Sequence, residues 1–197
     1  MKLKVTVQVL VILLIATFTC SAADHTHQSK YAGEEKREIK SLSATDIEEL
    51  KQGKGWGLAK AAELNGVPGP LHLLEMKKEI DLSADQVQEI ENLYRIMNQD
   101  AVFLGHKLIR LEKELNEHFA NRTITDKILH KILEDLAQVY KQLRYVHLSA
   151  HLQTPAILKS EQITLYNKLR GYSSDDPCQN VPKGHDPKMW KKHHNCP

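Results

Sequence analysis

Two long stretches of the chain repeat apolar residues at alternating intervals of three and four positions. This spacing places the apolar side chains along one seam of a helix, as in helices that pack lengthwise against each other. The first stretch follows Ser83 and ends at Asn121 and Arg122, and the second begins near Thr123 and reaches Pro155. The first seam consists of Val87, Ile90, Tyr94, Met97, Ala101, Leu104, Leu108, Leu111 and Leu115, and the second of Leu129, Ile132, Leu136, Val139, Leu143, Val146 and Ala150.

The sequence also predicts how the two long helices begin and how they are connected. Ser83 is followed three residues later by Gln86, and Thr123 by Asp126, a spacing typical of a capped helix start. Because only a few residues connect the two helices, we expect them to fold back as an antiparallel hairpin. Pro155 is expected to interrupt or bend the second helix, since proline cannot donate a backbone hydrogen bond.

Shorter helical segments flank this pair. Ser43 with Asp46 three residues later predicts another capped helix start, and the glycines of residues 53–57 end that helix. Asn65-Gly66 and Pro68-Gly69-Pro70 predict a turn, and Pro70 suits the first position of a helix. The expected short helices cover residues 43–50, 58–64, 70 to about 80, and 160–169.

These elements predict an all-α fold, in which a long antiparallel helical hairpin carries short flanking helices. An aromatic content of 6% and only 9 glycines agree with this, because a β-sandwich needs aromatic strands and glycine-rich turns. The expected organisation is a signal peptide at 1–23, a flexible lead at 24–42, a helical domain at 43–171 and a tail containing Cys and His at 172–197.

The first 23 residues have the pattern of a cleaved signal peptide. Lys2 and Lys4 precede the apolar run Val9–Ala16, and Ser21-Ala22-Ala23 offers small residues for cleavage before Asp24. The apolar run is short for a membrane span, which needs about 20 residues. We therefore expect a secreted protein, located in the periplasm.

Cleavage changes the charge and the cysteine count. The chain has 27 Lys and Arg against 25 Asp and Glu, and the signal carries two of the lysines and no acid. The mature chain is therefore formally neutral, which argues against a nucleic-acid partner. Cys20 follows Thr19, where a lipoprotein signal has a small residue, and this argues against lipidation. Cys178 and Cys196 remain as a plausible disulfide in an oxidising compartment.

Two segments of the chain have similar sequences. Leu82-Ser83-Ala84-Asp85-Gln86 and Leu158-Lys159-Ser160-Glu161-Gln162 both place Gln four residues after Leu at a helix entrance. This resembles the LTxxQ motif, which occurs twice in the Spy/CpxP-like family of periplasmic proteins. Lys159 replaces the Thr of the second motif, so its capping hydroxyl must come from Ser160 or be absent. Residues 55–66, followed by Pro68-Gly69-Pro70, look like a subgroup described as periplasmic heavy-metal sensors.

The resemblance covers roughly residues 70–172 and has structural and functional implications. It implies a four-helix, cradle-like subunit that is commonly a dimer, so we expect a homodimer. It implies a role in periplasmic stress or heavy-metal resistance. The members of this family hold unfolded clients, regulate a sensor kinase or bind metal.

The sequence contains none of the common catalytic motifs. The sequence has no nucleophile elbow, P-loop, dinucleotide fingerprint or HExxH helix. We therefore predict that the protein is not an enzyme and has no small-molecule substrate.

The leading candidate for a metal site is a pair of histidines on the second long helix. His147 and His151 are four residues apart, so both imidazoles project from one face of that helix. Such a pair can chelate Zn²⁺, Ni²⁺, Co²⁺ or Cu²⁺, and His72 and Glu75 are the candidates for further ligands. The alternative is that His147 and His151 are half-buried residues bonded to nearby carboxylates.

The two tails hold secondary candidates for metal ligands, and three other histidines do not qualify. Ala23-Asp24-His25 would be an amino-terminal copper or nickel site if cleavage fell one residue earlier. The C-terminal set suits copper, unless Cys178 and Cys196 form a disulfide. The secondary candidates are His25, His27, His185, Met189, His193, His194 and Cys196. The histidines expected not to bind metal are His106, His118 and His130.

A thin hairpin also exposes apolar surface that a partner could cover. The candidate residues for such a face are Met97, Leu104, Leu108, Tyr140 and Leu143. The alternative is that this stripe is the core of the hairpin itself. The sequence thus predicts a periplasmic metal-binding protein of the stress or heavy-metal response. A metal-independent holdase, or a regulator docking on a sensor kinase or anti-sigma partner, is the alternative.

Overall fold

The computed structural model describes residues 29–172, 181, 185–193 and 195–196. The predicted signal peptide therefore lies outside the described residues. The chain divides into two units at Gly33, and the described part of the first unit, residues 29–33, contains a turn. All helices of the described residues belong to the second unit, which begins at Glu34.

The described residues form helices, turns and loops, which confirms the all-α prediction. None of their helices is long and apolar enough to cross a membrane. Besides a 3₁₀ helix at Glu34–Lys36, the helices are α1 (Ala44–Lys51), α2 (Lys60–Glu63), α3 (Pro70–Glu75), α4 (Ala84–Ala120), α5 (Asp126–Ile157), α6 (Ser160–Leu169) and α7 (Pro187–His193). The expected helix beginning at residue 70 is shorter than predicted, because it ends at Glu75 and turns follow.

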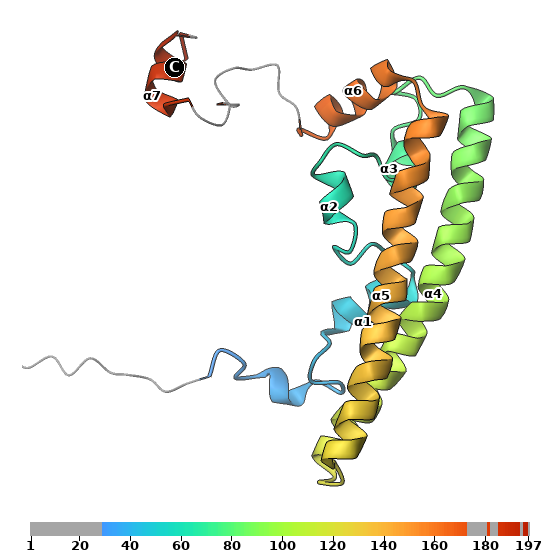
Figure 1. Ribbon diagram of the computed structural model, residues 1–197, viewed down its shortest axis with the longest axis vertical. Coiled ribbons are helices and arrows are strands. Elements are labelled where there is room, and N and C mark those ends of the chain that lie inside the picture. Colours follow the sequence, from blue (N-terminus) through green and yellow to red (C-terminus); the bar gives the residue numbers. More distant parts are fainter. Residues whose placement is uncertain (1–28, 173–180, 182–184, 194, 197) are drawn as a thin grey trace, which may run out of the picture. The chain divides into compact units, whose positions relative to one another are not determined.

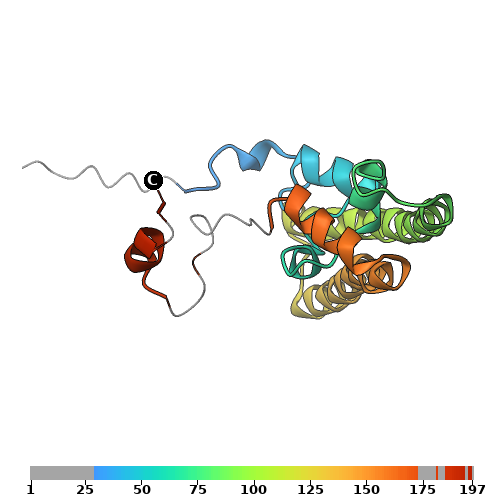
Figure 2. The same ribbon diagram turned by 90° about the horizontal axis from the view of Figure 1, so that it is seen from above.

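The long helices α4 and α5 lie side by side and are joined by residues 121–125 (Figures 1 and 2). Both predicted seams are buried or half-buried between them and the short elements. Ala101 of α4 and Val139 of α5 are fully enclosed in this core. The first core cluster contains Ile39, Leu42, Leu50, Leu58, Ala101, Leu104, Leu108, Ile132, Leu136, Val139 and Leu143.

The short N-terminal elements cover the apolar face that the sequence offered to a partner. Ile39 and Leu42, which fall in the expected flexible lead, are buried in this core together with Leu50 of α1. Of the five residues proposed to line a binding face, Met97, Leu104, Leu108 and Leu143 are buried and only Tyr140 is exposed. For the four buried residues the alternative therefore holds, that the stripe is the core of the hairpin, because the chain before α4 folds back over the seam.

The N-cap of α4 is the residue predicted from the sequence, whereas the N-cap of α5 lies two residues after the predicted one. The Ser83 hydroxyl accepts a hydrogen bond from the Gln86 amide, and the Gln86 side chain accepts one from the Ser83 amide. The cap of α5 is Thr125, whose hydroxyl accepts from the Ile128 amide at 3.3 Å, and not Thr123. The Thr123 hydroxyl instead lies 2.9 Å from Nδ1 of His118.

Pro155 neither ends nor interrupts α5, which continues to Ile157. A proline leaves the carbonyl four residues earlier without its helical donor. That carbonyl belongs to His151, and the Thr154 hydroxyl lies 3.1 Å from it and 2.6 Å from the Pro68 carbonyl. The expected interruption is thus absent, and the buried Thr154 connects this part of α5 to the loop before α3.

The two LTxxQ-like segments meet at the end of the molecule where α3, α4 and α6 pack. A second core cluster there consists of Leu73, Ile80, Ile90 and Tyr166. The amide of Lys159 donates to the Gln162 side chain at 2.9 Å, but no side-chain hydroxyl caps α6. The capping hydroxyl of the second motif is therefore absent, because Ser160 is already the first residue of the helix.

Candidate functional site

The three helix-borne histidines proposed as metal ligands line one cavity of about 210 Å³. Its lining residues come from α4, α5 and the segment from Gly53 to His72. This segment includes α2 and α3, which lie beside α5 (Figure 1). The polar lining residues of the cavity are Lys54, Lys60, Glu63, His72, Tyr94, His147 and His151. The wall is completed by four glycines and by Trp56, Ala59, Pro70, Leu71 and Met97.

His147 is the most strongly perturbed group in this cavity. Only 3% of the residue is exposed, and its Nε2 is buried without a hydrogen-bond partner. Burial, and next the charge of His151, lower its pKa to about 4. The imidazole is therefore neutral at pH 7, which is the form that binds a metal ion.

His151 is held in a fixed orientation by the loop before α3. Its Nδ1 lies 2.8 Å from the Val67 carbonyl oxygen. A carbonyl only accepts, so Nδ1 carries the hydrogen and Nε2 remains as the atom that can bind a ligand. The ring packs closely on Gly69, where an added Cβ would lie 2.7 Å from Nε2. The partner of this histidine is thus a backbone carbonyl and not one of the carboxylates considered from the sequence.

His72 and Glu75 are hydrogen-bonded to each other on α3. Nδ1 of His72 lies 2.7 Å from Oε2 of Glu75, and the side chains are 35% and 56% exposed. His72 lines the cavity, whereas Glu75 does not. Glu75 is therefore placed to orient His72 from outside the cavity. Across the described residues, no three His, Cys, Asp or Glu side chains converge closely enough to hold a metal ion as they stand.

Glu63 is a residue of this cavity that the sequence analysis did not single out. Its Oε1 accepts hydrogen bonds from the Tyr166 hydroxyl at 2.6 Å, the Tyr172 hydroxyl at 3.0 Å and Nε of Arg170 at 3.1 Å. Its Oε2 is buried and has no partner. Burial and the hydrogen bond to Glu63 raise the pKa of Tyr166. No spacing signals Glu63 in the sequence, because its partners lie more than 100 residues away.

Only some of the candidate metal ligands in the tails belong to the described residues. His25, His27, Cys178 and His194 lie outside the described residues. Cys196 is disulfide-bonded. His185, Met189 and His193 line a cavity of about 260 Å³ with Asp186 and Trp190, and the His185 ring packs edge-on to Trp190 at 4.9 Å.

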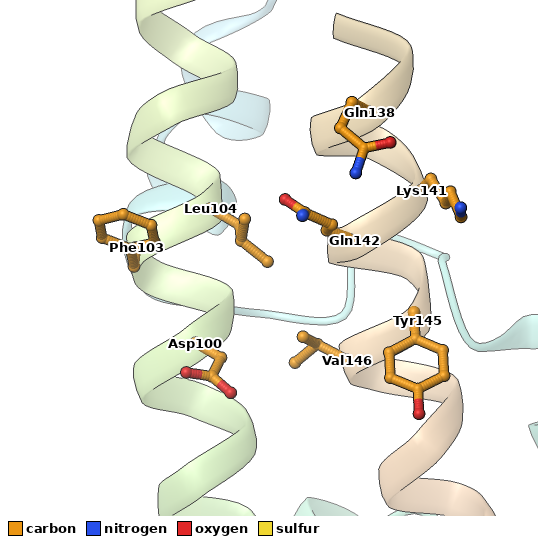
Figure 3. Close-up of a pocket in the computed structure, with 8 residues that line it drawn as sticks. All are labelled: Asp100, Phe103, Leu104, Gln138, Lys141, Gln142, Tyr145 and Val146. Carbon is orange, nitrogen blue, oxygen red and sulfur yellow. The ribbon is translucent and has the colours of Figure 1, made fainter. Parts of the chain in front are cut away.

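A second surface feature is an open groove of about 540 Å³ between α4 and α5 (Figure 3). Phe103 and Leu104 come from α4, and Tyr145 and Val146 from α5. Phe103 is 67% exposed and Tyr145 69% exposed. The remaining lining residues are Asp100, Gln138, Lys141 and Gln142. The two most exposed aromatic residues of the hairpin, Phe103 and Tyr145, thus lie at this groove beside the seam residues Leu104 and Val146.

Comparison with known proteins gives no identification: the sequence matches no protein-family model and no curated protein, and the fold matches no solved structure. The resemblance to the Spy/CpxP-like family stays a prediction based on the two motifs.

Proposed function

We propose that the protein binds a divalent transition-metal ion through His147 and His151, with His72 as a third ligand, and acts as a periplasmic metal-responsive protein. The observation that supports this best is the buried, unpartnered Nε2 of His147 in a cavity shared with two other histidines. A buried polar atom without a partner costs about 1–3 kcal/mol. A metal ion would remove that cost by taking the nitrogen as a ligand.

The chemistry of the donor set fits this class of metal. Imidazole nitrogens suit Zn²⁺, Co²⁺, Ni²⁺ and Cu²⁺, whereas Ca²⁺ and Mg²⁺ prefer oxygen. Histidines that bind metal usually donate their other ring hydrogen to a carbonyl or carboxylate, which fixes the ring. His151 has this relationship with Val67, and His72 is paired with Glu75 in a similar way.

Binding would connect two parts of the chain that lie far apart in sequence. His147 and His151 belong to α5, whereas His72 belongs to α3 and has a partly exposed side chain. His72 has to turn toward the pair for all three nitrogens to bind one ion. A metal changes the conformation only by binding one arrangement more tightly than another. The arrangement in which His72 of α3 turns toward α5 meets that condition, because it offers the ion three nitrogens.

The test is a calorimetric titration with Zn²⁺ of the predicted mature chain, residues 24–197, and of its His147→Leu/His151→Leu variant. The matched control is His106→Ala/His130→Ala, which removes two exposed histidines from α4 and α5. We expect the first variant to lose the tightest binding class, with affinity at least about 100-fold weaker, and the control to keep it. Equal affinity in both variants would show that the metal binds elsewhere, for example in the tails.

A second candidate function is a metal-independent holdase that uses the groove between α4 and α5. Its support is the pair of exposed rings, Phe103 and Tyr145, on either side of an open groove. Asp100 and Lys141 bring opposite charges and Gln138 brings an amide, so the lining selects no single charge. Such a mixed surface suits apolar segments of varied unfolded clients.

This function predicts suppression of client aggregation in the presence of a chelator. The variant Phe103→Ser/Tyr145→Ser should lose that suppression, as measured by light scattering. Leu152→Ser is the control, because Leu152 is an exposed apolar residue of α5 outside the groove. If the double variant instead changes only the oligomeric state in gel filtration, the groove is a contact between two copies of the chain.

A further inference from the structure

Glu63 has an unusual distribution of hydrogen bonds for a buried carboxylate. The residue is 9% exposed, and all three side chains that donate hydrogen bonds to its carboxylate donate to Oε1. Oε2 is buried and receives none. Buried carboxylate oxygens are normally paired or bound to metal, since removal from water is costly. The absence of a hydrogen-bond donor to the buried Oε2 therefore requires an explanation.

Arg170 could have satisfied both oxygens of Glu63 but does not. Arginine commonly binds a carboxylate with two parallel N–H groups. Here Nε of Arg170 donates to Oε1 of Glu63, whereas Nη2 donates to the Tyr172 hydroxyl at 3.1 Å. The Tyr166 hydroxyl also donates its hydrogen bond to Oε1 and not to Oε2. The surrounding protein thus fixes the carboxylate through one oxygen and leaves the other available.

The available oxygen belongs to a residue that lines the same cavity as His147. Both residues carry a buried polar atom without a partner, Oε2 of Glu63 and Nε2 of His147. The two atoms come from different elements, α2 and α5. The His and Glu side chains of this cavity do not converge on one point as they stand, so they have to shift for a cation to bind both atoms, each of which can offer a lone pair.

We propose that Oε2 of Glu63 is the carboxylate ligand of the metal site, completing a set of histidine nitrogens and one carboxylate oxygen. This rests on the proposed metal-binding function. Such a set favours Zn²⁺, Co²⁺ or Ni²⁺ over Cu⁺, which prefers sulfur ligands. The three donors on Oε1 are then the outer partners that hold the ligand in position. They also connect the site to α6 and to Tyr172 just after it.

The test compares Glu63→Gln with Glu91→Gln, which changes an exposed glutamate of α4. The Glu63→Gln variant retains an oxygen that Tyr166 and Arg170 can bond but loses the anionic ligand. We expect its Zn²⁺ affinity to fall on the order of 100-fold and the visible spectrum of bound Co²⁺ to change in position and intensity. The Glu91→Gln variant should match the unaltered protein in both measurements.

The outcomes separate this inference from the proposed function. Unchanged affinity and spectrum in Glu63→Gln, with binding lost in His147→Leu/His151→Leu, would overturn the role of Glu63 and keep the histidine site. Binding retained in the histidine variant would overturn both. A readout on the unaltered protein covers the case in which the Glu63→Gln variant does not fold. Zn²⁺ should shift a carboxylate band in the infrared difference spectrum, and no shift would overturn the inference.

Discussion

The side-chain amides of Gln86 and Gln162 pair with each other. Nε2 of Gln86 donates to Oε1 of Gln162 at 2.8 Å, and Nε2 of Gln162 donates to Oε1 of Gln86 at 3.0 Å. Gln86 also donates to the Ile157 carbonyl, and Gln162 to the Asp81 carbonyl. Each carbonyl lies five residues before the other glutamine, so the two LTxxQ-like segments contact each other with approximate two-fold symmetry.

We predict that Gln86→Ala lowers the free energy of unfolding by on the order of 3 kcal/mol, measured by urea denaturation. The substitution removes both hydrogen bonds between the two side-chain amides and takes the Gln86 donor away from the Ile157 carbonyl, in a largely buried position. Because the same contact is removed either way, Gln86→Ala and Gln162→Ala should be strongly non-additive. The control Gln88→Ala, at an exposed site of α4, should change stability by less than about 0.5 kcal/mol. Additive losses would show that the pairing contributes little.

Gly105 lies in the middle of α4, where glycine costs roughly 1 kcal/mol relative to alanine. A Cβ at this position would overlap the carbonyl oxygen of Leu50 in α1. We therefore predict that Gly105→Ala destabilises the protein by about 1–3 kcal/mol, measured as the urea midpoint, because α1 must move away. Gly55→Ala is the control, since its Cβ would meet nothing within 4 Å. A stabilised Gly105→Ala variant would contradict the close approach of α1 to α4.

The low pKa of His147 predicts a loss of stability in acid. In the folded state the pKa is about 4, below the ordinary value of 6.5, so the unfolded chain binds the proton more readily. The contribution of the buried neutral ring is complete above about pH 6.5 and is lost as the pH falls toward 4. The stability of the unaltered protein relative to His147→Leu should fall by on the order of 3 kcal/mol over this range, measured with chelator present. A difference independent of pH would mean that His147 titrates normally.

Zinc should raise the melting temperature of the unaltered protein if the cavity binds it. A ligand that binds only the folded state at 100 times its dissociation constant stabilises by about 2.7 kcal/mol, which corresponds to roughly 5–10 °C for a chain of this size. His147→Leu/His151→Leu should lose most of that rise, and His106→Ala/His130→Ala should retain it. An equal rise in all three proteins would place the binding in the tails.

The sequence determined those features that depend on neighbours within about four residues. The spacing of apolar residues predicted α4 and α5, because a helix brings positions three and four apart onto one face. Ser43 and Ser83 were correctly identified as caps for the same reason, since a cap bonds an amide three residues away. The cap of α5 was assigned two residues early, because Thr123 and Thr125 both have suitable side chains.

Only the tertiary structure decided which surfaces the chain covers and which polar atoms meet. Leu104 and Leu143 are core residues because the segment before α4 folds over them, which helical periodicity does not reveal. His151 is bonded to Val67, 84 residues earlier, and Glu63 is bonded to Tyr166, 103 residues later. Such contacts depend on the path of the loops between helices, and no local rule sets that path. The sequence therefore identified the histidine pair, and only the tertiary structure could bring Glu63 into the same cavity.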